Sequence, residues 1–354
     1  MNELEDRVRA ALAPYRFSDD THLRELKLRP ARRPPRRRFV ALIAATAALL
    51  VAVGLVVTLP QGVPGGPDPA AAAVLHRFAR IAGHAPASAQ PPADGEFVYR
   101  KTMDTGLALF LPGPGLEPIA YRISGVEERW LGTDGSARVI YREGHPEFLT
   151  DADRDAYEAI QGTAAGEAWA DHRFGRVYDQ RYGPGELGGE GLPDLSKLPT
   201  DPVELRQLLY DREIMGGPPG DWESFAIAAD VLGQGYLSPE LRSAMYEVMS
   251  TIPGTQVIGT VKDELGRAGI AIGYTHDGIR DEIIFDRQTG TILSKRSVRA
   301  VDDPGALTDE EQVGDPESPC CSTIAWSGTE AGTVEYSVVY LTDMEVVADE
   351  DDRP

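Results

Sequence analysis

The chain has 354 residues and a formal net charge of −21 at pH 7, with 56 acidic against 35 basic side chains. This length is sufficient for one large domain, or for two closely packed domains, in addition to a membrane anchor. Nucleic acid and anionic lipid headgroups are repelled by an acidic surface, so the charge argues against both as ligands of the acidic part of the chain.

The charge is divided unevenly along the chain. Residues 1–38 carry 11 Lys or Arg and 6 Asp or Glu, net +5, which leaves 24 against 50, net −26, for the remainder. Within this basic segment Leu4, Val8 and Leu12 recur at helical spacing. These three side chains are a candidate contact for a cytoplasmic protein partner. The alternatives are that the segment adsorbs to the membrane surface or that it is disordered.

Residues 39–59 form an uncharged, apolar run, "FVALIAATAALLVAVGLVVTL". At about 1.5 Å rise per residue this run makes a helix of about 31 Å, which matches a hydrocarbon core of about 30 Å. A cleaved signal peptide and a buried core helix are the rival interpretations. We predict a single transmembrane helix.

The basic residues near the two ends of the run set its orientation. Six arginines lie between residues 29 and 38, whereas the next Lys or Arg after the run is Arg77. By the positive-inside rule, residues 1–38 are cytoplasmic and the rest of the chain is extracytoplasmic. We therefore predict a Pro/Gly linker at residues 60–69, an extracytoplasmic domain at residues 70–348 and an acidic tail at residues 349–354.

Hydrophobic periodicity predicts helices and strands that are largely segregated along this domain. Expected helices cover residues 70–84, 151–161, 202–215, 221–234 and 238–252. Expected strands cover residues 96–103, 120–132, 137–143, 255–263, 267–275, 280–286, 291–300 and 332–347. Because tight turns join many of these strands, we expect an antiparallel sheet and an α+β fold.

One predicted hairpin specifies which side chains are buried. In "RDEIIFDRQTGTILSKRS", residues 280–297, Ile283 and Phe285 share one face and Gly290 lies in the turn. We expect Ile292, and with it Ser294, to meet them or their neighbours across the ladder.

Several segments together carry a resemblance to a known family. They are the apolar run, "DPAAAAVLHRFA", "LPTDPVELRQLL", "IPGTQVIGTVKDELGRAGIAI" and "IIFDRQTGTILSKR". The chain resembles a family of uncharacterised actinobacterial single-pass membrane proteins that are frequently encoded beside extracytoplasmic-function sigma factors. More distantly, the outer domain is similar to the half-barrels of lipoprotein carriers and of periplasmic sensors that regulate anti-sigma factors.

The resemblance implies a curved antiparallel sheet packed on helices, and a role in the cell envelope. We expect a membrane-anchored sensor or regulatory protein, linked through its cytoplasmic segment to a partner such as a sigma factor. The alternative is a tethered binder of lipid or lipoprotein, with an apolar ligand in the outer domain. A zinc-dependent anti-sigma domain needs a cytoplasmic cluster of His and Cys residues. Residues 1–38 contain His22 and no cysteine, so we do not expect an ordinary zinc-dependent anti-sigma factor.

The sequence contains partial matches to cofactor-binding and metal-binding motifs, and each lacks a feature that the motif requires. Residues 183–188 fit G-x-G-x-x-G, but no helix start follows to bind a pyrophosphate. Asp151, Asp153 and Asp155 fit the start of a calcium loop that lacks its glycine and its final glutamate, so we interpret them as a capped helix start. The histidines show no metal-ligand spacing. We assign no catalytic, cofactor-binding or metal-binding residue and expect no enzyme activity.

Cys320 and Cys321 are adjacent, and they are the two cysteines of the chain. In an extracytoplasmic setting a disulfide persists, but adjacent cysteines close only a strained ring. We expect a vicinal disulfide or two thiols in a loop, with a redox or copper(I) sensor as the alternative.

Overall fold

The computed structural model describes twelve segments of the chain. These are residues 29–30, 66–84, 92–113, 115–134, 136–171, 174–183, 198–211, 220–234, 237–301, 305–306, 330–342 and 344–353. The transmembrane prediction at residues 39–59, the partner contact at Leu4, Val8 and Leu12, and the pair Cys320 and Cys321 all lie outside them. No helix within the described segments is long and apolar enough to cross a membrane.

The described fold is α+β, as the sequence predicts. Its helices are α2 (Pro69–Gly83), α3 (Asp151–Ile160), α4 (Ala164–Asp171), α5 (Pro202–Leu209), α7 (Asp221–Gln234) and α8 (Pro239–Met249). Its strands before α3 are β2 (Phe97–Phe110), β3 (Ile119–Gly132), β4 (Ala137–Glu143) and β5 (Glu147–Phe148). The later strands are β6 (Val177–Tyr182), β7 (Gln256–Lys262), β8 (Ala268–His276), β9 (Ile279–Phe285), β10 (Ile292–Arg299), β12 (Val334–Tyr340) and β13 (Glu345–Val347).

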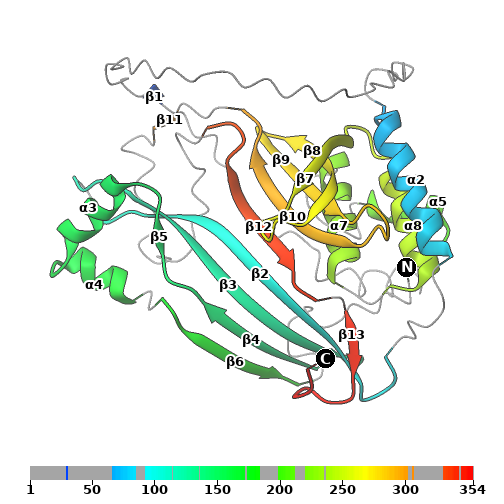
Figure 1. Cartoon of the computed structure of the whole chain (residues 1–354), viewed down its shortest axis with the longest axis horizontal. Coiled ribbons are helices and arrows are strands. Elements are labelled where there is room, and N and C mark those ends of the chain that lie inside the picture. The colour runs from blue at the N-terminus through cyan, green and yellow to red at the C-terminus, as the bar shows by residue number, and fades with distance from the viewer. Residues whose placement is uncertain are drawn as a thin grey trace, which may run out of the picture.

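The strands form one curved antiparallel sheet. Its order among the described strands is β6-β4-β3-β2-β12-β10-β9-β8-β7, with β13 paired to β2 and β5 to β3. Figure 1 shows that the long strands β2 and β3, with β4 and β6 beside them, extend away from the part of the sheet formed by β7 to β10. The last long strand of the chain, β12, therefore joins the N-terminal hairpins to the C-terminal ones. A separate two-residue pair joins β1 (Arg29–Pro30) to β11 (Gly305–Ala306).

The main apolar core lies between β7 to β10 and the helices α2, α5, α7 and α8, which gather at one end of the molecule (Figure 1). Phe285 is fully buried there and contacts the rings of Phe78 and Tyr246 at centroid distances of 5.3 and 5.9 Å. In register, Phe285 pairs with Ile292. The predicted inward face is confirmed for Ile283 and Phe285, which both belong to this core. Ser294 pairs instead with Ile284, because the register shifts after Ile292.

Side-chain caps explain where several of these helices begin. Ser238 Oγ accepts a hydrogen bond from the amide of Leu241 at 3.1 Å, and Thr150 Oγ1 accepts one from the amide of Asp153 at 3.1 Å. Each cap satisfies an amide that has no partner within its helix, which typically stabilises a helix by about 1 kcal/mol. The capped helix start predicted at Asp151 and Asp153 is therefore confirmed.

A smaller aromatic core closes the opposite end of the sheet. Helices α3 and α4 pack there against the start of β3, where Trp169 contacts the rings of Tyr121 and Phe110 at 5.0 and 4.9 Å. Helix α4 was not expected from the sequence, because "AAGEAWAD" has a single large apolar residue and so no clear amphipathic stripe.

The last residues of the chain form the acidic tail that the sequence predicts. They contact the face of β3 and β4 on which Trp130, Glu128 and Arg138 lie. Trp130 Nε1 donates a hydrogen bond to the backbone oxygen of Asp352 at 2.6 Å. The Arg353 guanidinium lies 5.0 Å from the centre of the Trp130 ring and donates to Glu128 Oε1 at 2.8 Å. Arg138 forms an ion pair with Asp351. We call residues 350–353 the docked tail.

Candidate functional site

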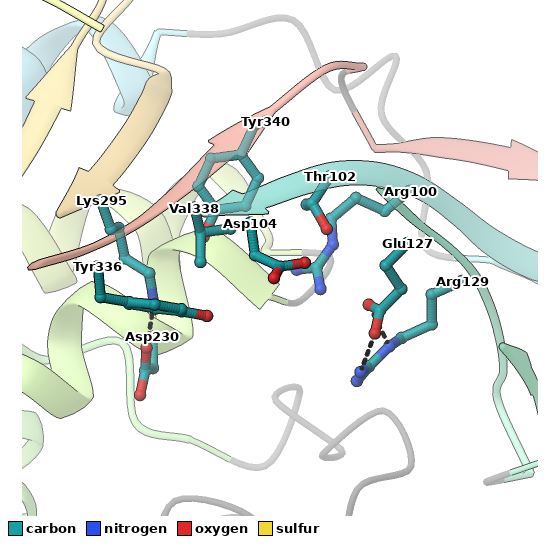
Figure 2. A pocket seen from close by; sticks show the side chains of 10 residues that line it. All are labelled: Arg100, Thr102, Asp104, Glu127, Arg129, Asp230, Lys295, Tyr336, Val338 and Tyr340. Atoms are coloured by element: carbon teal, nitrogen blue, oxygen red, sulfur yellow. Dashed lines mark hydrogen bonds and ion pairs between the residues drawn. The ribbon is translucent and has the colours of Figure 1, made fainter. Parts of the chain in front are cut away.

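A cavity of about 310 Å³ opens on the face of the sheet that is turned toward α7, and we call it the polar cavity. Figure 2 shows side chains from β2, β3, β10 and β12 together with one from α7 around it. Its lining residues are Arg100, Thr102, Asp104, Glu127, Arg129, Asp230, Lys295, Tyr336, Val338 and Tyr340. Three cations and three carboxylates thus share one small space with two tyrosines.

The strand register explains why these residues meet. Thr102 pairs with Glu127 on β3 and with Tyr340 on β12, and Asp104 pairs with Val338. Side chains on alternate positions of paired strands project from the same face of a sheet. The polar residues of β2 therefore line up with those of its two neighbours.

Two of the cations form ion pairs within the lining. Lys295 on β10 contacts Asp230 on α7, and Arg129 donates two hydrogen bonds to Glu127, at 2.9 and 3.0 Å. Burial alone would lower the pKa of Lys295, but the neighbouring Tyr340 and Asp230 raise it above its ordinary value. The ammonium group of Lys295 therefore stays charged and fixes α7 to the sheet.

Arg100 holds the end of α7. Its Nη1 donates a hydrogen bond to the backbone oxygen of Gly233 at 2.6 Å, and its guanidinium lies 5.7 Å from the centre of the Tyr340 ring. The carbonyls of the last helical turn have no partners within the helix, so a buried arginine at this position satisfies one of them.

Asp104 differs from the other two carboxylates because none of the described cations forms an ion pair with it. Its Oδ2 accepts a hydrogen bond from the hydroxyl of Tyr141 at 3.2 Å. Tyr141 reaches it across Gly125, where an added Cβ would lie 2.1 Å from the tyrosine oxygen. A glycine at position 125 is therefore required for Tyr141 to approach Asp104.

Tyr336 lies on the other side of Asp104. It pairs in register with Gly106, and a Cβ added there would lie 3.5 Å from the ring of Tyr336. Figure 2 shows the ring of Tyr336 at the edge of the cavity, on the side where Lys295 meets Asp230. Two tyrosines, each lying against a glycine, thus flank one carboxylate.

The pKa values of Asp104 and Tyr336 reflect their partial burial. Burial raises the pKa of Asp104 above its ordinary value, and the hydrogen bond from Tyr141 opposes this only in part. Burial, and next the charge of Asp104, raise the pKa of Tyr336 to about 12. Burial is thus the largest cause of both shifts, and the charge of Asp104 adds to the shift of Tyr336.

Three histidines of the described segments, His76, His84 and His276, lie in different places and have structural contacts. His76 Nδ1 lies 2.6 Å from Glu247, His84 Nδ1 lies 2.7 Å from the Arg80 carbonyl oxygen, and the His276 ring stacks on Trp222 at 4.5 Å. Within the described segments no group of three His, Cys, Asp or Glu side chains could hold a metal ion. Asp153 accepts a hydrogen bond from the amide of Ala120 at 2.8 Å, so it joins α3 to β3.

Sequence reasoning missed every residue of the polar cavity. One signal was present in β2, where Arg100 and Thr102 are buried in alternation with Val98 and the half-buried Asp104 follows in the same phase. Polar side chains in the buried phase of a strand indicate either an ion-pair network or a site. The pattern could mark the strand, but it could not name the partners on β10, β12 and α7.

Comparisons with known proteins add no further assignment. No family model, curated protein or solved structure matches the chain.

Proposed function

We propose that the chain is a membrane-anchored sensor or regulatory protein of the cell envelope. In this proposal residues 39–59 span the membrane once, the α+β domain lies outside and binds a small polar molecule, and residues 1–38 contact a cytoplasmic protein. The observation that carries the ligand-binding part is the polar cavity, since its lining residues come from five elements, its six charged groups come from four of them, and they surround space for a small molecule.

The same observation weighs against the tethered lipid binder. A lipid carrier needs an apolar cavity between sheet and helices. In the described part of the chain that space is filled by fully buried side chains, including Leu75, Phe78, Met245 and Phe285. The cavity beside α7 is lined by six charged residues, and burying an acyl chain against them would desolvate charges without compensation.

The pairing of β1 with β11 bears on the anchor, because it brings residues 29–30 beside residues 305–306 and so requires both on one side of a membrane. A two-residue pairing contributes about 1 kcal/mol per hydrogen bond. The twelve Leu, Ile, Phe and Val residues between 39 and 59 favour insertion by on the order of 5 kcal/mol in total. In a membrane we therefore expect insertion to prevail over this pairing.

Photo-crosslinking tests the regulatory part of the proposal. A crosslinking amino acid placed at Val8 of the full chain in its native membrane should capture a discrete cytoplasmic protein. The substitution Leu12→Asp should reduce that product about tenfold or more, because a charge would enter an apolar helix-in-groove contact. Leu12→Ile is the matched control and should retain most of the product.

Two results would contradict the regulatory proposal. One is a smear of products that Leu12→Asp leaves unchanged and that fades with salt, which indicates adsorption to lipid. The other is the absence of any crosslinked protein, which indicates a segment without a partner.

A further inference from the structure

We propose that the polar cavity binds a ligand through a cationic ammonium group placed between Asp104 and Tyr336, with Tyr141 orienting the Asp104 carboxylate from outside the cavity lining. This inference deepens the proposed function by naming the chemical class of its ligand, and it rests on that function only for the biological meaning of binding.

Two of the three carboxylates that line the cavity are paired with cations that the structure describes, and Asp104 is not. Lys295 is paired with Asp230, and Arg129 is paired with Glu127. Asp104 has a single side-chain partner among the described residues, the neutral hydroxyl of Tyr141. A cation from outside the chain would complete the pairing at Asp104.

Two tyrosines lie near the Asp104 carboxylate. Tyr336 and Tyr141 lie against Gly106 and Gly125, on opposite sides of Asp104 along the sheet. A cation is attracted to the face of an aromatic ring, and aromatic rings are the usual setting for recognition of quaternary ammonium groups. Of these two rings Tyr336 lines the cavity, and Tyr141 holds the Asp104 carboxylate through its hydroxyl. The two glycines leave the rings room to lie near the carboxylate.

The volume of the cavity and the cations that line it limit the ligand. A volume of about 310 Å³ holds a small organic ion but excludes a folded peptide. The cationic side chains of Arg100 and Lys295 line the same cavity, so a second positive charge on the ligand would be repelled there. The expected ligand is thus a monocation whose other end offers oxygen acceptors to these donors.

Choline is a suitable probe, because its isostere 3,3-dimethylbutan-1-ol has the same shape without the charge. The full chain is purified in a maltoside detergent, and saturation transfer from protein to the methyl groups of each compound is measured by NMR at pH 7. We expect transfer to choline and none to the neutral isostere. Asp104→Asn should raise the apparent Kd for choline, obtained by titrating the signal, about tenfold, which corresponds to about 1.4 kcal/mol. Tyr336→Leu should raise it less.

A stability measurement separates a ligand-binding role for Asp104 from a structural one. The folded pKa of Asp104 is raised, so its ionised form costs stability at pH 7, and this cost is relieved only as the pH falls through that pKa. Asp104→Asn keeps an acceptor for Tyr141 and removes the charge. The variant should therefore unfold at a higher temperature than the parent while losing choline. Asp155→Asn, on the exposed face of α3, should change neither property.

The inference is overturned if choline gives no saturation transfer, if the neutral isostere binds as well as choline, or if Asp104→Asn lowers stability and leaves choline binding unchanged. None of these results bears on the membrane anchor or on the cytoplasmic partner. A failure of the ligand class is therefore distinguishable from a failure of the proposed function.

Discussion

Replacing Phe285 by Asp is expected to abolish the folded state of the α+β domain. The side chain is fully buried between β9, α2 and α8, where it contacts Phe78 and Tyr246. Truncating a buried phenylalanine typically costs about 3–5 kcal/mol, and an unpaired carboxylate in the same place costs several more. Because domains of this kind are stable by about 5–15 kcal/mol, this substitution removes most or all of the margin.

Circular dichroism during thermal unfolding tests this expectation. The Phe285→Asp variant should show no cooperative transition, whereas the control Leu116→Asp should melt close to the parent because Leu116 is 48% exposed. A cooperative transition of Phe285→Asp within a few degrees of the parent would contradict the assignment of this core.

Removal of the docked tail is the second large effect that we expect. A chain that ends at Val347 loses the bond from Trp130 to Asp352, the stacking of Arg353 on Trp130 and the ion pair of Arg353 with Glu128. Uncovering a buried aromatic side chain costs about 2–3 kcal/mol, and among the described residues Glu128 keeps its contacts with Tyr99 and Arg142. We expect a loss of about 3 kcal/mol in unfolding free energy and a red shift of tryptophan fluorescence.

The contribution of Glu128 should depend on pH in a defined direction. Burial would raise its pKa, but hydrogen bonds from Arg353, Arg142 and Tyr99 lower it to about 2 from an ordinary value of 4.5. A lowered folded pKa stabilises the protein fully above the ordinary value, and that stabilisation is lost as the pH falls toward the folded pKa. The difference in stability between the parent and Arg353→Ala should therefore shrink between about pH 4.5 and pH 2.

Arg122→Ala is the matched control, since Arg122 is an exposed arginine on the same strand. Its stability should follow that of the parent at every pH. If Arg353→Ala shows the parent's stability and fluorescence, the tail does not dock on Trp130 in solution.

Most helices and strands were predictable because local signals specify them. Ser238 and Thr150 cap helices where the sequence places caps, and the hairpin of β9 and β10 has the predicted face inward. Strand β2 is longer than the predicted 96–103, since pairing with β3 and β12 continues through Gly106, which has little strand propensity. Helix α5 ends at Leu209, before the predicted residue 215, and Tyr210 is its C-cap.

The polar cavity could not be predicted from the sequence, because its residues meet only through long-range register. Asp104 and Val338 are 234 positions apart, yet they pair directly between β2 and β12. Lys295 meets Asp230 because α7 packs against β10. Local patterns predict which residues of a strand share a face, but they do not predict which strands are neighbours. The docked tail likewise carries no local signal beyond its acidity.

Thiol labelling of intact protoplasts tests the central claim, that the domain is anchored with its cavity outside the membrane. The native cysteines Cys320 and Cys321 are the only two of the chain, so a membrane-impermeant maleimide, added after an impermeant reductant, reports the side on which they lie. The account predicts equal labelling before and after lysis. In a chain with both replaced by serine and Leu12→Cys added, it predicts labelling only after lysis. Labelling of Cys320 and Cys321 only after lysis, or of residue 12 in intact protoplasts, would contradict it.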